Sequence, residues 1–407
     1  MPSISSLQGD WLRMLSEAQP QVGEMLARSP EEQERLGYFH TLREICQQPS
    51  TWLGTAELMR QSAGVLAPVV AGISSLIMSG SGSSDYAGDC VGMVLQKELG
   101  VTAQAIPSGT LLTDCSNALP VGRPGLMVSL ARSGDSPESV GALLLMLRTE
   151  PALRHLVLTC NRQGRLATAF QGDPRVTVIT LDDSTHDRSL VMTSSFTNLV
   201  LGARFLGLIQ APERYLSICG ELSRTASLLL QRHFSTLAHV GKQPFHRVLF
   251  LGSGPRFAAT REAALKMLEM TAGRVTTSCS TYLGLRHGPM SAVNEETLVV
   301  CFLSTEPRVR AYEVDLLQEL ARKQLGLLRL IVGKDVPREM VGVKDVVVPY
   351  EGGELLDENL PVLDVVVSQM LAFFRCLQEG LRPDSPSEAG VIQRVVPGFA
   401  LHLPNGV

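Results

Sequence analysis

Three charged residues at helical spacing are the first candidates for chemistry in this chain of 407 residues. Glu262, Lys266 and Glu269 are four and three positions apart, which places them on one face of a helix. Such a row is usually a solvated surface with modest ion pairing. If the face is turned into a cleft instead, the charges couple and a carboxylate can transfer protons. We expect the side of this helix that packs on a sheet to be apolar, formed by Ala264, Leu265 and Leu268.

A histidine follows this helix in a turn. His287 stands in Arg286-His287-Gly288-Pro289, beside glycine and proline and outside any apolar run. A lone histidine is more often structural than catalytic. Because imidazole gains and loses a proton near neutral pH, His287 is still a candidate acid or base.

Three segments rich in glycine and hydroxyl groups could hold an anion: residues 80–85, 131–139 and 193–197. Each opens a helix-like stretch, where backbone N–H groups and the helix dipole favour negative charge. Each could also be ordinary helix capping, with Ser136 as the N-cap residue before Pro137. Three such turns in one half of the chain favour a phosphate site. Its candidate residues are Gly82, Ser83, Ser84, Arg132, Ser133, Ser136 and Thr193.

Apolar runs alternate with amphipathic runs from about residue 75. Apolar runs without clean alternation indicate strands of a parallel sheet covered by helices on both faces. The expected strands are 76–78, 102–106, 126–130, 156–160, 176–181, 248–251, 275–278, 298–303, 328–332 and 346–349. The expected helices are 84–99, 137–148, 192–208, 212–240, 255–271, 308–324 and 361–377. This order predicts an α/β fold, whose ligands bind at the carboxyl ends of the strands.

The chain repeats itself. A Gly-Ser-Gly turn follows an apolar run at Gly80 and again at Gly252, an offset of 252 − 80 = 172 residues. The same offset relates residues 128–130 to 300–302 and 156–158 to 328–330. One domain has therefore been used twice. The second copy has Pro255-Arg256 where the first has serines, so we expect the first half to hold the anion.

The repeat predicts five parts. They are an N-terminal helical extension (1–50), a first domain with the phosphate anchor (51–211), a linker helix (212–240), a second domain with the acid/base helix (241–380) and a C-terminal tail over the cleft (381–407).

Composition excludes several classes of protein. A net charge of −4 without basic runs argues against nucleic-acid binding. The eight cysteines are dispersed, as expected for reduced thiols. Residues 1–6 do not resemble a signal peptide, and we expect no apolar stretch of membrane-spanning length. We expect a cytoplasmic protein that contacts no membrane.

Several strings together carry a specific resemblance. The chain resembles the double sugar-isomerase (SIS) domain family, and within it the tagatose-6-phosphate ketose/aldose isomerase group, which includes galactosamine-6-phosphate deaminases. The strings are Arg43-Glu44-Ile45-Cys46-Gln47-Gln48-Pro49, Ala131-Arg132-Ser133-Gly134-Asp135-Ser136-Pro137-Glu138-Ser139, Thr185-His186-Asp187-Arg188 with Met192-Thr193-Ser194-Ser195, Ala264-Leu265-Lys266-Met267-Leu268-Glu269-Met270-Thr271-Ala272-Gly273, Arg286-His287-Gly288-Pro289, and Pro383-Asp384-Ser385-Pro386-Ser387 with Arg394-Val395-Val396.

The resemblance implies a fold of two tandem SIS domains. Each would be a five-stranded parallel sheet in a three-layer α/β/α arrangement. It also implies roles, most clearly by similarity to the isomerase half of glucosamine-6-phosphate synthase. Ser83, Ser84, Ser133 and Ser136 would hold the sugar phosphate. Glu269 would move a proton between C1 and C2, and His287 would open the sugar ring from a neighbouring subunit of a homodimer or larger oligomer. Glu262, Lys266, Asp187 and Arg394 would support them.

The chain also departs from that relative. Ala131 stands where the relative has a phosphate-binding serine. The relative's imine-forming C-terminal lysine has no clear counterpart, and the tail offers Arg394 instead. The departures argue against a lysine imine, and we expect neither metal nor cofactor.

The expected activity is conversion of galactosamine 6-phosphate to tagatose 6-phosphate and ammonia. Two alternatives remain: a ketose/aldose phosphosugar isomerase without deamination, and a non-catalytic phosphosugar-binding regulator. A dinucleotide-binding fingerprint fails, because Asp85 stands where its third glycine is required.

Overall fold

A computed structural model describes residues 13–119 and 125–403 of the chain. Its contacts divide the chain into two compact units, each built on one five-stranded parallel sheet. The first-sheet unit comprises Thr51–Asp187, Ser194–Cys219 and Ile392–Val407. The second-sheet unit comprises Met1–Ser50, Arg188–Thr193 and Gly220–Val391. Each unit therefore combines segments that are distant in the sequence.

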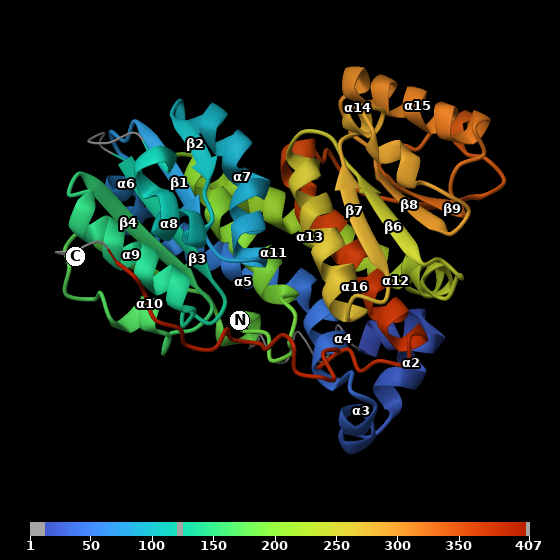
Figure 1. Ribbon diagram of the computed structural model, residues 1–407, viewed down its shortest axis with the longest axis horizontal. Helices are drawn as coiled ribbons and strands as arrows, with labels where there is room; N and C mark the ends of the chain where they lie inside the picture. The colour runs from blue at the N-terminus through green and yellow to red at the C-terminus, as the bar shows by residue number, and fades with distance from the viewer. Residues whose placement is uncertain (1–12, 120–124, 404–407) are drawn as a thin grey trace. The chain divides into compact units, whose positions relative to one another are not determined.

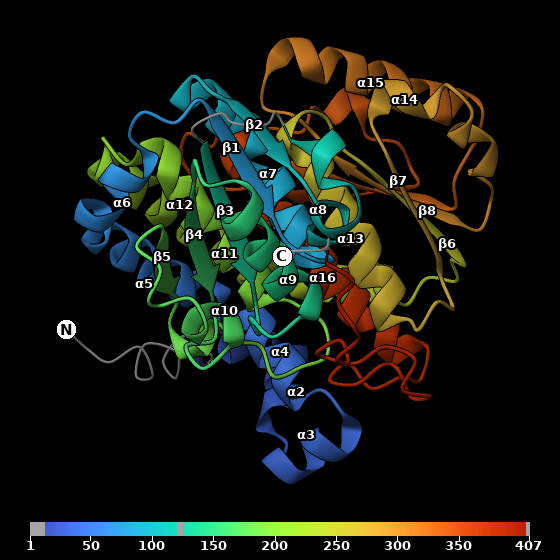
Figure 2. The same ribbon diagram turned by 60° about the vertical axis from the view of Figure 1, so that its left-hand side comes forward.

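The first-sheet unit has its strands in the order β2-β1-β3-β4-β5, all parallel, as Figure 2 shows for β1, β3, β4 and β5. The strands are β1 (Ser75–Ser79), β2 (Thr102–Ala105), β3 (Gly125–Ala131), β4 (Leu153–Thr159) and β5 (Val176–Thr180). β1 and β3 are buried along their whole length, because helices cover both faces of the sheet.

Two helix pairs cover this sheet. The helices are α7 (Ser83–Leu99), α8 (Ser108–Ala118), α9 (Pro137–Thr149) and α11 (Ser194–Arg204). On the side of α8 and α9, Met127 packs with Leu111 and Met146. On the side of α7, Gly88 lies so close to Met78 that an added Cβ would be 2.7 Å from the methionine Cβ. This glycine allows α7 to approach the strand closely.

The second-sheet unit repeats this topology, with strands in the order β10-β9-β8-β6-β7. The strands are β6 (Arg247–Leu251), β7 (Thr276–Ser280), β8 (Thr297–Phe302), β9 (Leu328–Gly333) and β10 (Asp345–Pro349). The flanking helices are α13 (Pro255–Met270), α14 (Tyr282–Leu285), α15 (Pro307–Arg322) and α16 (Pro361–Gln378). Figure 1 shows α14 and α15 on one side of this sheet and α13 with α16 on the other. Leu316 and Leu320 of α15 pack on Val299 and Ile331.

Further helices complete the units. They are α2 (Pro20–Ala27), α3 (Pro30–Leu36), α4 (Phe39–Cys46), α5 (Gln48–Gln61), α6 (Ala63–Val70), α10 (Arg165–Thr168) and α12 (Pro212–Gly241). The predicted helix over 212–240 is present as α12, and the predicted N-terminal helices are present as α2–α4 within the described residues. α4 buries Leu42 and Ile45 within the second-sheet unit.

The helix α16 corrects one expectation. It has 18 residues and is long and apolar enough to cross a membrane, whereas no such stretch was expected. Because 89% of that window is buried inside the protein, α16 has the burial of a core helix of a globular protein.

The C-terminal tail is held by specific contacts. In the second-sheet unit, the carboxylate of Asp384 accepts hydrogen bonds from His40 N at 3.1 Å and Thr41 N at 2.7 Å, and so caps the start of α4. In the first-sheet unit, Leu401 lies against Gly141 of α9. All eight cysteines are free, as expected.

Candidate active-site residues

Two of the three predicted anion loops of the first half lie side by side. β1 is the strand at which the order of the first sheet reverses, and it pairs with β3. In open α/β sheets, ligands bind at the carboxyl ends of strands at such a point. The loop after β1 and the first turn of α9 also meet directly, with Ser81 Oγ 3.3 Å from Ser139 Oγ. The fold thus brings together two residues that are 58 positions apart in the sequence.

The loop after β1 turns back tightly on the start of α7. Gly82 has φ 58° and ψ −127°, a conformation suited to glycine. A Cβ at Gly80 would lie 2.4 Å from the carbonyl carbon of Ser84, so this position also needs glycine. Ser83 and Ser84 are both buried at the amino end of a helix of 17 residues, where the dipole favours an anion.

The loop after β3 contains two of the predicted anion-binding hydroxyl groups, those of Ser133 and Ser136. Ser136 is the N-cap residue of α9, as predicted, but its side chain makes no capping hydrogen bond. Ser133 Oγ accepts a hydrogen bond from Asp135 N at 3.3 Å, and its carbonyl accepts one from Asn161 Nδ2 at 2.8 Å. Gly134, with φ 70°, makes the turn. Helix capping therefore does not account for the hydroxyl of Ser136.

The third predicted turn faces inward. The carboxylate of Asp187 accepts hydrogen bonds from Ser194 N at 3.1 Å and from Ser195 N at 2.9 Å, and also from the Ser195 hydroxyl. Thr197 Oγ1 accepts a hydrogen bond from Trp52 Nε1 at 2.9 Å. Asp187 thus caps α11. The hydroxyl groups of Ser195 and Thr197 form hydrogen bonds inside the first-sheet unit.

A cationic cluster lies beside the loop after β3. Arg132 Nη2 donates to the carbonyl of Arg394, and Arg394 Nε donates to the carbonyl of Asp187 at 2.9 Å. His186 stands next to Asp187. Burial, together with the charges of Arg394 and Arg132, lowers the pKa of His186. Its buried Nε2 has no hydrogen-bond partner among residues 13–119 and 125–403. The quoted string Thr185-His186-Asp187-Arg188 includes this histidine, but sequence reasoning gave it no role.

The acid/base row lies on α13 and is largely buried. Lys266 Nζ lies 3.5 Å from Glu262 Oε1, and neither side chain is exposed. Lys266 Nζ also donates to Glu269 Oε2. The side chain of Glu269 keeps 22% of its surface exposed. The row is therefore a buried ion-pair network whose last carboxylate reaches solvent, which excludes the common case of a fully solvated face.

The packing side of α13 differs from the expected one. Leu268 is 43% exposed, and Ala264 and Leu265 are only half-buried. The buried apolar residues are Ala258, Ala259, Ala263, Met267 and Met270. The expectation that Leu268 packs into the sheet is therefore wrong. Helical spacing groups residues into faces, but it does not tell which face turns inward.

His287 lies in the predicted turn. It follows α14, its N–H donates to the carbonyl of Gly284 at 3.0 Å, and its side chain is exposed. The next residue, Gly288, has φ 123°, which a residue with a side chain rarely adopts. The turn therefore projects an imidazole on the surface of the chain.

Sequence reasoning missed two residues that hold the segment 188–193 within the second-sheet unit. Glu44 Oε1 accepts a hydrogen bond from Arg188 N at 2.5 Å and Oε2 accepts one from the Ser189 hydroxyl. Gln369 Nε2 donates to the carbonyl of Thr193, the candidate binding residue, at 3.1 Å. Glu44 belongs to the string Arg43-Glu44-Ile45-Cys46-Gln47-Gln48-Pro49, which carries part of the family resemblance and could have pointed to this residue.

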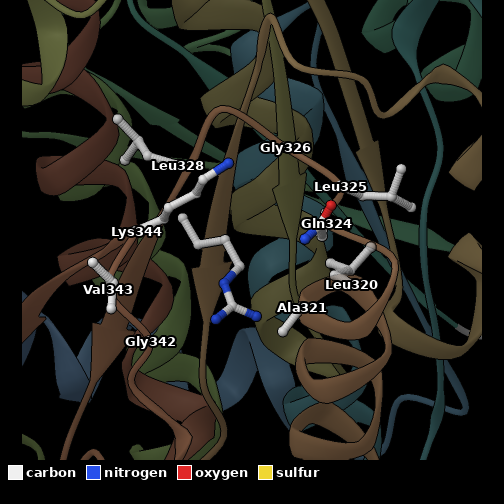
Figure 3. A pocket seen from close by; sticks show the side chains of 10 residues that line it. Leu320, Ala321, Gln324, Leu325, Gly326, Leu328, Gly342, Val343 and Lys344 are labelled. Carbon is white, nitrogen blue, oxygen red and sulfur yellow. The ribbon is translucent and has the colours of Figure 1, made fainter.

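One cavity of about 370 Å³ lies away from all predicted site residues. It is at the amino ends of β9 and β10, the opposite end of the sheet from the loops. Figure 3 shows its lining, with Lys344 on one side and Gln324 on the other. Among the residues that the structure describes, no group of three or more His, Cys, Asp or Glu side chains could hold a metal ion.

Comparison with known proteins identifies the family. No family model matches the chain. D-galactosamine-6-phosphate deaminase AgaS of Shewanella sp. (strain ANA-3) is 35% identical over 385 residues, 93% of this chain and 95% of that protein. D-galactosamine-6-phosphate deaminase AgaS of Escherichia coli is 32% identical over 372 residues, 89% and 95% of the two chains.

A solved structure agrees with these relatives. The crystal structure of tagatose-6-phosphate ketose/aldose isomerase from Escherichia coli superposes with a TM-score of 0.82 at 29% identity, covering 90% of this chain and 97% of that one. The predicted fold of two tandem SIS domains is confirmed. With relatives above 30% identity over nearly their whole length, the chain belongs to the AgaS family of D-galactosamine-6-phosphate deaminases.

Proposed function

We propose that the protein is a deaminating isomerase that converts galactosamine 6-phosphate to tagatose 6-phosphate and ammonia. The observation that carries this proposal is the network on α13, where buried Lys266 contacts both Glu262 and the partly exposed Glu269. A carboxylate held in this way beside solvent is suited to proton transfer at carbon. Relatives with 35% and 32% identity bear the name of this activity.

The chemistry needs one base and one anion anchor. Glu269 takes the proton from C2 of the open-chain sugar and returns it to C1, which converts the amino aldose into a ketose imine. Water then adds to the imine carbon and ammonia leaves, which gives the ketose phosphate. His287 supplies and removes the proton during ring opening.

The first-sheet unit supplies the phosphate anchor in this proposal. Ser83 and Ser84 lie at the start of α7, and Ser133 and Ser136 lie in the loop after β3. Arg132 adds positive charge and is 8% exposed. Gly82 makes the close turn after β1. Binding of the remote phosphate can lower the barrier at C1 and C2.

Isomerisation without deamination is the second candidate. It uses the same proton transfer, and one solved relative bears the name tagatose-6-phosphate ketose/aldose isomerase. The two candidates differ in the C2 substituent of the substrate: an amino group leads to an imine that water hydrolyses, whereas a hydroxyl group leads directly to the ketose. We further propose that the protein is cytoplasmic. We also propose a homodimer or larger homo-oligomer, because the resemblance implies that the exposed His287 acts in the active site of a neighbouring subunit.

The test is a substrate panel. Galactosamine 6-phosphate, glucosamine 6-phosphate and tagatose 6-phosphate are incubated with the full chain, and ammonia and ketose or aldose are measured separately. Ammonia and ketose released in equal amounts from galactosamine 6-phosphate support the proposal. Interconversion of ketose and aldose without ammonia supports the second candidate. The absence of any turnover would contradict both.

A further inference from the structure

The second Gly-Ser-Gly loop has the same backbone shape as the first. Gly254 has φ 54° and ψ −132°, and Gly82 has φ 58° and ψ −127°. Each loop leads from a central strand into a long helix, α13 or α7. In each sheet the neighbouring central strand, β8 or β3, is followed by a loop and a helix that begins with proline. The second copy therefore retains the backbone of an anion site.

The hydrogen-bond donors at this second site are taken by a carboxylate of the chain itself. Asp357 Oδ1 accepts hydrogen bonds from Thr305 N at 2.7 Å and Thr305 Oγ1 at 3.0 Å. Asp357 Oδ2 accepts one from the Ser304 hydroxyl. By the offset of 172 residues, Thr305 corresponds to Ser133 of the first copy. The side chain of Asp357 thus binds where the corresponding loop of the first copy offers serines.

A second carboxylate closes the same site from α15. Glu313 Oε2 accepts a hydrogen bond from Ser304 N at 2.8 Å. The residue is 1% exposed, and its Oε1 is buried without a partner among the described residues. Burial raises the pKa of Glu313. The loop after β8 is therefore bonded to two carboxylates, those of Asp357 and Glu313.

The arginine at this site, Arg256, is bonded to groups in the interior of the second-sheet unit. Arg256 occupies the position of Ser84, and it is fully buried. Its Nε donates to Asp364 Oδ2 at 2.8 Å, its Nη2 donates to Asp364 Oδ1 at 2.6 Å, and its Nη1 donates to the carbonyl of Leu303. A bidentate pair of this kind leaves the guanidinium unavailable to an external anion.

In the first copy, the loop after β3 contains an aspartate whose carboxylate is bonded outside the loop. Asp135, in the loop after β3, accepts a hydrogen bond from Arg165 N at 2.9 Å and so caps the short helix α10. The hydroxyl of Ser136 makes no capping bond. The aspartate of this loop is therefore bonded away from it, toward α10.

We infer that Asp357, with Glu313, is a built-in anion that occupies the second copy's phosphate loop, so that each chain binds one phosphosugar. The loop of the second copy is suited to a small oxyanion, and the carboxylate of Asp357 takes the place of that ligand. The count of one phosphosugar rests on the proposed function of the first-sheet unit. The occupation of the second loop rests on the contacts of Asp357 alone.

Removal of this carboxylate tests the inference. In Asp357→Ala the donors of Ser304 and Thr305 lose their acceptor, and small oxyanions can bind in its place. Melting temperature is measured in formate, inorganic phosphate and chloride at equal ionic strength. We expect the variant to melt several degrees lower in chloride and to recover much of the loss in formate or phosphate. Wild type and the exposed-carboxylate control Glu57→Ala should show little difference between these salts.

Asp357→Asn keeps the volume of the side chain and removes its charge. Its amide fills the space, so we expect a lower melting temperature that formate and phosphate do not restore. Wild-type stability of Asp357→Asn would overturn the inference, as would equal recovery of Asp357→Ala in all three salts. If Asp357→Ala does not fold, the comparison of Asp357→Asn with wild type still decides the role of the carboxylate.

Stoichiometry gives an independent measurement. Titration calorimetry of wild type with tagatose 6-phosphate should show one site per chain, and two sites would overturn the inference. Ser133→Ala with Ser136→Ala should weaken that site. Inactivity toward every sugar phosphate, combined with oxyanion recovery of Asp357→Ala, would contradict the proposed function and leave the built-in anion intact.

Discussion

Lys266 and Glu262 form an ion pair one turn apart on α13, with 3.5 Å between Nζ and Oε1 and no exposure of either side chain. Two opposite charges removed from water cost free energy unless each neutralises the other. The pair therefore fixes the ammonium that also contacts Glu269. The position of Glu269, the proposed base, therefore depends on Lys266 and Glu262, which need not touch the substrate.

Loss of Lys266 should destabilise the protein. In Lys266→Met the buried carboxylate of Glu262 is left without its cation, and removal of one partner of a buried pair typically costs about 3–5 kcal/mol. Glu262→Gln combined with Lys266→Met should recover much of that loss, because no buried charge remains. Urea unfolding of both variants measures the difference. A double variant no more stable than Lys266→Met would show that the two side chains do not act as a pair.

Glu269→Gln should retain the fold and lose turnover. The side chain is partly exposed, so its replacement by an isosteric amide should change the free energy of unfolding little. We expect kcat to fall by about 10²–10⁴-fold, the usual contribution of a general base. Leu268→Gln, at the exposed position next to it, is the matched control and should retain activity. Activity of Glu269→Gln near that of wild type would remove Glu269 as the base.

Ser133→Ala with Ser136→Ala should act mainly on KM. Hydrogen bonds to a charged group contribute about 1.5–3 kcal/mol each, so we expect KM for the sugar phosphate to rise at least about tenfold. Thr113→Ala is a control on the same unit, because its hydroxyl donates only to the backbone of α8. An unchanged KM in the double variant would place the phosphate elsewhere.

His155 should make stability depend on pH. Burial, together with the charge of Arg175, lowers its pKa to about 4, from about 6.5 in the unfolded chain. Between these values the unfolded state binds the proton and the folded state does not, so stability falls as the pH is lowered from about 6.5 to about 4. The difference is about 3 kcal/mol for this group.

His155→Leu should weaken this pH dependence. Neither ring nitrogen of His155 has a hydrogen-bond partner within the described part of the chain, so the apolar replacement breaks no hydrogen bond there. Unfolding free energies of wild type and His155→Leu, measured at pH 7 and pH 5, give the comparison. Equal losses in the two proteins would assign the acid sensitivity to other groups.

Mixed oligomers test the shared site. Glu269→Gln and His287→Ala subunits are each expected to be inactive, and subunits that are unfolded and reassembled together should recover activity. Recovery is expected because a mixed oligomer contains sites in which both residues are intact. Reassembly of each variant alone is the control. Mixed assemblies as inactive as the parents would place His287 and Glu269 in the same subunit's site.

Much of the fold could be predicted because the local signals agree with the tertiary structure. The apolar runs, the Gly-Ser-Gly turns and the proline-initiated helices mark the strands and loops of both sheets. The helix α8 was missed because its sequence, SGTLLTDCSNA, is rich in residues whose side chains compete with the helical backbone. Its Asp114 has non-helical angles, φ −150° and ψ 40°.

The residues of the candidate site could be predicted from the sequence, but their burial and their contacts could not. Spacing placed Glu262, Lys266 and Glu269 on one face, yet burial of that face depends on packing that no local pattern encodes. Likewise, Asp357 lies about fifty residues beyond Ser304, and nothing near either residue signals their hydrogen bond. Such contacts are set by the whole topology of the sheet.

Gly164 limits which substitutions the protein can tolerate near the loop after β3. A Cβ at this position would lie 2.2 Å from the carbonyl oxygen of Ser133, so even alanine would displace the loop after β3. The residue makes no proposed contact with a sugar, yet it sets the space behind the loop. A directed-evolution library aimed at new sugars should therefore keep Gly164 fixed and vary the residues in front of the loop.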